Sequence, residues 1–291
     1  IEATFSPELE ALAVKSNATC RQVMDRLTRQ YDGYRFTKDE EFTSMYNPFS
    51  VLSALQKRSY GNYWFASGTP TFLVEMLQKT DFDLREMEGI EVNEASLSDD
   101  RADINNPIPM IYQSGYLTIK DYDERFRMYT LGFPNEEVKY GFLNFVSPFY
   151  TPIAQTDTSF YIGKFIRELE SGDVDAFLTR LRCFFAGIPY DLNDRTERHY
   201  QTVFYLVFQL MGQFTETEVR SARGRADAVV KTPDYIYVFE FKLNDSAEAA
   251  LRQIDEKGYL LPYQADGRKV VKVGVAFEKE ERNIGEWMIG G

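Results

Sequence analysis

The stretch GRADAVVKTPDYIYVFEFKL, residues 224–243, decides the fold of the C-terminal third of the chain. It predicts two strands around a turn at residues 232–234, because β-branched and aromatic residues flank a Pro-Asp pair. Both faces of the second strand begin apolar, which indicates a central strand covered on both sides. Side chains alternate along a strand, so Glu240 and Lys242 share one face near its end. An acid and a base inside an apolar strand need an explanation.

Asp227, in the preceding predicted strand, can reach the same end of the sheet as Glu240. Unpaired charges there would cost several kcal/mol, so the groups must be paired, exposed at the sheet end or bound to a cation. Two converging carboxylates repel each other unless a cation lies between them, and their oxygens suit magnesium. With Lys242 to hold a water or a phosphate oxygen, the group is typical of metal-assisted phosphodiester hydrolysis. The alternative is an ion-pair cluster at the sheet edge.

The surrounding pattern predicts an α/β unit around a mixed sheet. An apolar helix begins near Glu197 and ends at Gly212. Three strands follow, over residues 217–224, 225–232 and 235–243. A helix over 245–258 begins with a capping-box spacing, and a last apolar strand covers 269–278.

Asp227, Glu240-x-Lys242 and this order of helices and strands resemble the PD-(D/E)xK nuclease superfamily, with its restriction-endonuclease-like αβββαβ core. The resemblance implies that Asp227 and Glu240 bind magnesium or manganese and that the carbonyl of Phe241 adds a ligand. It also implies that Lys242 orients the attacking water. Ala226 stands where the literal motif has Pro.

Two further residues match positions of that superfamily. Glu197, on the first helix, matches an additional catalytic acid of many members, and Gln253 resembles the glutamine of the RecB-like branch. That branch has a tyrosine four residues later, whereas this chain has Lys257 and then Tyr259. A solvated first helical turn is the alternative for Glu197, and a helix-surface position is the alternative for Gln253.

Arg220, Arg223 and Arg225 cluster beside Asp227 in the sequence. They are candidates for binding the phosphates of a substrate. Ordinary charge at a strand edge explains them equally well.

The rest of the chain predicts a mainly helical region with a helix, hairpin and helix over residues 105–146, a winged-helix-like order. The segments YDGYRF, YNPFSVL, YWFASGTPTFL, YQSGYLTIKDYD, LGFPNEEV and ERHYQTVFYLVFQLMG resemble a bacterial family that joins an AAA-ATPase-like domain to a C-terminal PD-(D/E)xK domain. We therefore expect three parts. Residues 1–90 resemble the end of the ATPase-like domain, 91–190 form a connector with the winged-helix-like unit and a helical pair, and 191–291 form the nuclease-like domain.

That resemblance places the phosphate-binding loop of the family upstream of Ile1, so ATP is expected to bind only through a region absent from this chain. Because the first residue is Ile rather than Met, we expect a fragment or a processed product.

Composition limits the classes of function. The net charge is −12; residues 196–291 carry 13 Lys and Arg against 15 Asp and Glu, so −10 belongs to residues 1–195. An acidic chain argues against tight non-specific binding of nucleic acid. Two cysteines far apart fit a reducing cytoplasm, and a single histidine, His199, argues against a zinc site. No apolar run is long enough to span a membrane, and no secretory leader opens the chain.

Three hypotheses follow for function. The first is a magnesium-dependent nuclease acting on nucleic acid, with DNA favoured over RNA. The second is a module of an ATPase-like protein that binds nucleic acid or protein without cutting it. The third is a structural domain in which the three charged residues form a salt-bridge cluster. The sequence leaves the substrate and the oligomeric state open.

Overall fold

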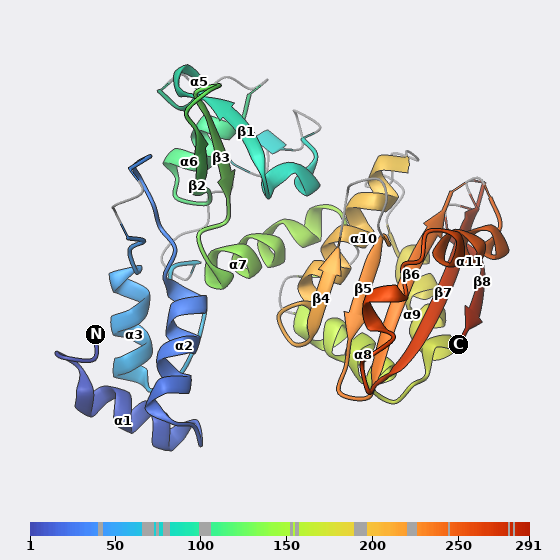
Figure 1. The fold of residues 1–291 in the computed structure, drawn as a ribbon, viewed down its shortest axis with the longest axis horizontal. Coiled ribbons are helices and arrows are strands. Elements are labelled where there is room, and N and C mark those ends of the chain that lie inside the picture. The colour runs from blue at the N-terminus through green and yellow to red at the C-terminus, as the bar shows by residue number, and fades with distance from the viewer. Residues whose placement is uncertain are drawn as a thin grey trace. The chain divides into compact units, whose positions relative to one another are not determined.

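The computed structural model describes residues 1–39, 43–65, 73, 76–77, 82–98, 106–151, 154, 157–188, 197–219, 226–243, 245–278, 280–281 and 283–291. The chain divides into two compact units, residues 1–142 and 143–291. Figure 1 labels the elements of each. This division follows compactness alone, and the predicted three-part domain organisation stays a prediction.

The first unit begins with three helices, α1 (Ser6–Lys15), α2 (Cys20–Tyr31) and α3 (Pro48–Lys57). Their apolar faces meet in one core around Leu12, Leu27 and Val51. Thr19 begins α2 with a capping box in which the side chains of Thr19 and Gln22 bond reciprocally to the backbone. This helical start agrees with the sequence prediction.

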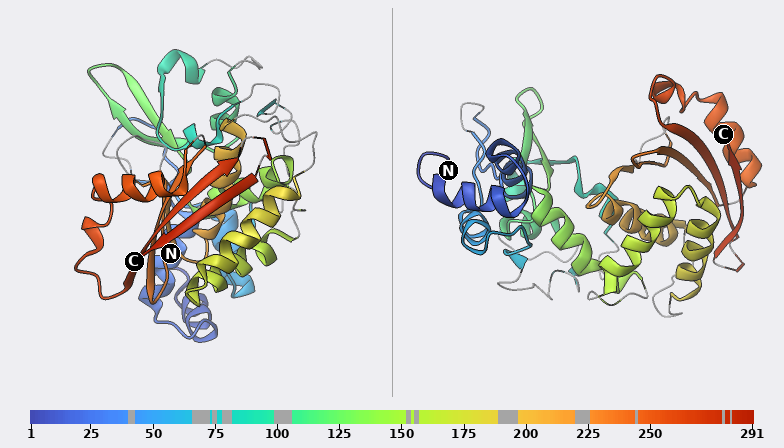
Figure 2. Two further views of the ribbon diagram at one scale, coloured as in Figure 1. Left: turned by 90° about the vertical axis from the view of Figure 1, so that its right-hand side faces the viewer. Right: turned by 90° about the horizontal axis from the view of Figure 1, so that it is seen from below.

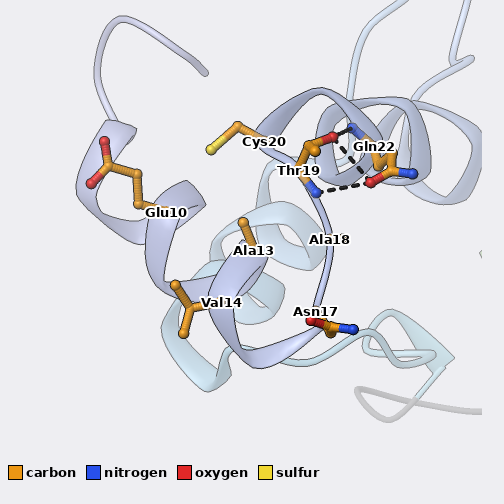
Figure 3. Close-up of a pocket in the computed structure, with 8 residues that line it drawn as sticks. All are labelled: Glu10, Ala13, Val14, Asn17, Ala18, Thr19, Cys20 and Gln22. Carbon is orange, nitrogen blue, oxygen red and sulfur yellow. Dashed lines mark hydrogen bonds between the residues drawn. The ribbon is translucent and has the colours of Figure 1, made fainter.

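A hollow lies where α1 ends and α2 begins. Ala13, Val14, Asn17, Thr19 and Cys20 are among the residues that line it (Figure 3). The capping box forms part of its wall, so the backbone amides of Thr19 and Gln22 already have side-chain partners there.

The first unit also contains a three-stranded antiparallel sheet with the order β1-β3-β2. Its strands are β1 (Ile90–Asn93), β2 (Thr118–Asp123) and β3 (Met128–Gly132). The short helix η2 (Leu84–Met87) precedes β1, and the short helices α5 (Glu94–Ser98) and α6 (Ile108–Gln113) lie between β1 and β2 in sequence. Helix α7 (Glu136–Val146) follows and contains the boundary between the units. The expected hairpin is present. The winged-helix assignment stays a prediction.

An aromatic cluster fills the centre of the first unit. The rings of Trp64 and Phe65 pack edge to face on one another, and both contact Tyr116, which packs on Phe142. Such edge-to-face contacts add to the burial energy of the rings. They join the end of the helical segment to the sheet and to α7.

The second unit is built on a five-stranded sheet with the order β4-β5-β6-β7-β8. Only β6 and β7 pair in parallel; the other pairs are antiparallel. The predicted mixed sheet is therefore confirmed. The strands are β4 (Glu216–Val219), β5 (Ala228–Lys231), β6 (Tyr235–Lys242), β7 (Lys269–Glu278) and β8 (Asn283–Gly290). Strand β8 was not predicted.

Helices cover both faces of this sheet (Figure 2). One face is aromatic: Phe239 and Phe241 of β6 pack on Phe177 and Phe204. The helices there are α8 (Thr158–Glu170), α9 (Val174–Ala186) and α10 (Glu197–Met211), after the short η3 (Ser147–Phe149). The opposite face is aliphatic and packs on Ile254 of α11 (Ala247–Glu256), which precedes η5 (Leu261–Tyr263).

Strand β8 is tied to the aromatic side by one hydrogen bond, from Trp287 Nε1 to Asp175 Oδ1 of α9 at 2.8 Å. Among the described residues, no helix combines the length and the apolar character needed to cross a bilayer.

Candidate active site

The site lies at the end of the β5–β6 hairpin. Pairing between these strands ends at Ala228 and Phe239, whereas β6 continues to Lys242. The amide of Phe241 therefore extends beyond the ladder with β5. Asp227 replaces the missing partner, since its Oδ2 accepts from Phe241 N at 2.9 Å. This bond fixes the Asp227 carboxylate beside the C-terminal end of strand β6.

Glu240 and Lys242 point to the α11 face of the sheet, as the alternation predicts. Lys242 Nζ lies 3.2 Å from Glu240 Oε1. Gln253 of α11 bonds to both, because its Nε2 donates to Glu240 Oε1 and its Oε1 accepts from Lys242 Nζ. The three side chains form a closed ring of polar contacts, and Gln253 belongs to the cluster rather than to the outer helix surface.

Burial dominates the electrostatics. Glu240 is only 3% exposed. Its burial raises its pKa to about 7; the charge of Asp227 also raises it, and Lys242 opposes the shift. Burial raises the pKa of Asp227 as well, against the Phe241 amide and Lys242. The two carboxylates therefore share a poorly solvated place where a cation would relieve their repulsion.

The donor set fits a magnesium ion. Glu240 Oε2 is buried without a hydrogen-bond partner among the described residues, so it can accept a cation. Asp227 uses Oδ2 for the Phe241 amide, and within the described chain Oδ1 forms no hydrogen bond. Magnesium is bound in proteins by one or two carboxylates with several waters, and two carboxylates satisfy that need. Among the described residues, no group of three or more His, Cys, Asp or Glu is placed to hold a metal, so waters or other oxygen ligands would have to complete the shell around these two carboxylates.

The remaining predicted site residues are placed less completely. Glu197 is the first residue of α10, which packs on the aromatic face, and its side chain is outside what the structure describes. Arg220, Arg223 and Arg225 also lie outside the described residues. The ring of Phe241 stacks on Phe204, with centroids 4.1 Å apart, so it faces away from Glu240.

Comparison with known proteins agrees with this geometry. Residues 195–287 match the PD-(D/E)XK nuclease superfamily. This match falls on the region, residues 191–291, for which that resemblance was expected.

One relative covers nearly the whole chain. It is the "Uncharacterized protein in vnfD 5'region" of Azotobacter chroococcum mcd 1, 31% identical over 293 residues, which are 98% of this chain and 54% of that protein. The chain thus spans about half the length of this curated relative. No solved structure matches the chain.

Two residues that position the carboxylate cluster were not predicted. Gly274 of β7 lies opposite Glu240 in the parallel ladder, and a Cβ there would lie 2.3 Å from the carbonyl oxygen of Ala247. Its missing side chain lets α11 approach the sheet closely enough for Gln253 to reach Glu240. The available signal was a glycine inside an apolar strand.

The second is Glu286 of β8, whose Oε1 accepts from the Ala247 amide in the first turn of α11 at 3.1 Å. It satisfies a donor that the helix cannot satisfy itself. It could not be found from the sequence because β8 was not predicted.

Proposed function

We propose that the second unit is a metal-dependent nuclease that hydrolyses phosphodiester bonds of nucleic acid, with DNA favoured over RNA. One observation carries the proposal: Asp227, just before β5 rather than within it as expected, and Glu240 of β6 place two poorly solvated carboxylates beside Lys242 at one end of the sheet.

Each residue has a proposed role. Asp227, Glu240 and the carbonyl of Phe241 hold magnesium or manganese, which when bound lowers the pKa of water and neutralises charge on the phosphate. Lys242 orients the attacking water and contributes positive charge next to the scissile phosphate. Gln253 holds Glu240 and Lys242 in place through its two hydrogen bonds.

The other predicted residues complete the proposal. Glu197 would act as an additional acid from α10. Arg220, Arg223 and Arg225 would bind substrate phosphates, since a guanidinium matches phosphate geometry.

A second function is binding without cutting. The closed ring of Glu240, Lys242 and Gln253 favours it, because Lys242 already has two partners in the protein. In that case the cluster would be a salt bridge of a binding module. We further propose that residues 1–90 derive from an AAA-ATPase-like domain, that ATP acts only through a region outside this chain, and that the protein works in the cytoplasm.

Calorimetric titration with magnesium and manganese tests the site directly. The wild type is compared with Asp227→Asn and Glu240→Gln, and Glu248→Gln is the control, because Glu248 lies on the exposed side of α11 and pairs with Arg252. Nuclease activity is then measured on single- and double-stranded DNA and RNA. We expect both site variants to lose metal binding, and cutting to fall by about 100-fold or more, while the control matches the wild type.

Binding without cutting by the wild type would favour the binding module. If the wild type binds no metal, the catalytic proposal is wrong.

A further inference from the structure

The first unit carries a basic-aromatic surface that the proposed active site does not use. We define it by the exposed cations Lys15, Arg26, Lys57 and Arg58 with the half-buried rings of Tyr60 and Tyr63. These residues come from the ends of α1 and α3, the middle of α2 and the segment after α3.

Contacts make this surface continuous. Lys15 Nζ donates to the carbonyl oxygen of Lys57 at 3.4 Å. Lys57 Nζ lies 4.5 Å from the centre of the Tyr63 ring, and Arg26 Cζ lies 3.8 Å from the centre of the Tyr60 ring. Tyr60 and Tyr63 lie on the same segment after α3, which joins the two halves.

The charge of this surface stands out in a chain with a net charge of −12. Within the described residues, none of the four cations forms an ion pair with an acid. Lys15 and Lys57 lie in the last turns of their helices, where the helix dipole favours a cation. That effect does not explain Arg26 or Arg58.

Arg58 carries a second signal. It ends α3 in the left-handed conformation, with φ of 51°, at a position where glycine or asparagine is favoured. An arginine there costs backbone strain that glycine would avoid, and this strain motivates the hypothesis that its exposed guanidinium serves a ligand.

We propose that the basic-aromatic surface binds single-stranded nucleic acid outside the candidate active site. Cations spaced along a surface neutralise successive phosphates, and the Arg26 guanidinium, which lies over the Tyr60 ring, offers a planar face on which an unpaired base can stack. A duplex keeps its bases stacked inside, so only a single strand can use both features. The choice of nucleic acid over an acidic protein partner rests on the proposed nuclease function.

A pair of matched double variants tests this surface. Arg26→Gln with Arg58→Gly removes two charges, and glycine suits the left-handed backbone at 58. Arg125→Gln with Arg127→Gly is the control: it makes the same changes elsewhere in the unit, and Arg127 is also left-handed, with φ of 53°. Both retain every residue of the proposed active site.

The measurement is fluorescence anisotropy of a labelled oligothymidylate of about 20 nucleotides, in EDTA and over a range of salt. We expect Arg26→Gln with Arg58→Gly to weaken binding by about 10-fold or more at low salt. Its slope of log K against log salt should fall by about 1.4, which is two single-strand phosphate contacts. The control should bind as the wild type does, and a duplex of the same length should bind more weakly.

Equal affinity of the two double variants, tighter binding of duplex, or no binding by the wild type would overturn the proposal. EDTA separates this result from catalysis. If the surface fails but the wild type cuts with magnesium and Glu240→Gln does not, the proposed nuclease function stands. If the surface binds but no metal-dependent cutting occurs, the proposed nuclease function falls and the binding surface stands.

Discussion

At the scale of single residues, each of the two units contains a buried glutamate. Glu240 lies in the second unit, and Glu137 of α7 is 1% exposed in the first. Glu137 Oε1 accepts from the amide of Trp64 at 3.0 Å. Burial raises the pKa of Glu137 above its ordinary value, while the hydrogen bond from the backbone amide of Trp64 opposes the shift.

The raised pKa of Glu137 predicts a pH dependence of stability. The folded state holds this proton more tightly than the unfolded state, so the contribution is fully present below the unfolded pKa, near 4.5, and is lost as pH rises through the folded pKa. The melting temperature of the wild type should therefore fall as pH rises between about pH 4 and pH 7. We expect this fall to be smaller in Glu137→Gln, which has no proton to lose at this position. Circular dichroism of both proteins measures it. Parallel pH profiles would mean that Glu137 does not cause the dependence.

Asp227, Glu240 and Lys242 could be predicted as one cluster because strand alternation and hairpin pairing are local rules. Whether Gln253 joins them could not be decided, since that depends on how closely α11 packs on the sheet. The contacts that set this distance come from Gly274 and Glu286, both distant in sequence.

At the scale of elements, α11 is the part that completes the site. It is held by Ile254 in the aliphatic core, by Glu286 at its first turn and by the close approach at Gly274. The helix brings one functional side chain, Gln253, to two strand residues. Its distance from the sheet therefore controls the site.

Gly274→Val tests this dependence. Its side chain would overlap the Ala247 carbonyl and the Leu251 amide, which are backbone atoms that cannot rotate away. We expect a loss of stability of roughly 1–3 kcal/mol and weaker magnesium binding, since α11 must move outward. Urea unfolding and calorimetry measure the two effects. Gly267→Val is the control, because a Cβ there meets nothing within 4 Å. Unchanged metal affinity in Gly274→Val would show that α11 spacing does not position the site.

The helices and strands with strong periodicity were predictable, including the β5–β6 hairpin and α11. Strand β8, NIGEWMIG, was not, because two glycines and an asparagine in eight residues give it a weak strand pattern. Its pairing with β7 and the Trp287–Asp175 bond supply what local preference lacks.

At the scale of the whole molecule, the chain divides into two compact units, and one of the two proposed sites lies in each. The carboxylate cluster lies in residues 143–291, and the basic-aromatic surface lies in residues 1–142. A ligand of one site should therefore protect mainly its own unit.

Hydrogen exchange with and without magnesium checks this expectation. A ligand at about 100 times its dissociation constant stabilises the folded state by about 2.7 kcal/mol. We expect slower exchange in β5, β6 and α11, and no change in α1–α3. In the Asp227→Asn variant, magnesium should not slow exchange in any of these elements. Protection of the first unit by magnesium, or protection that persists in this variant, would place the metal elsewhere.

The two tryptophans of the chain fall one in each unit, Trp64 in the aromatic cluster of the first and Trp287 on β8 of the second. This distribution provides a built-in pair of optical reporters. With Trp64→Phe the tryptophan fluorescence would come from the nuclease-like unit alone. With Trp287→Phe it would come from the first unit alone. The wavelength and intensity of the tryptophan fluorescence would then report the unfolding of each unit separately, without an attached dye.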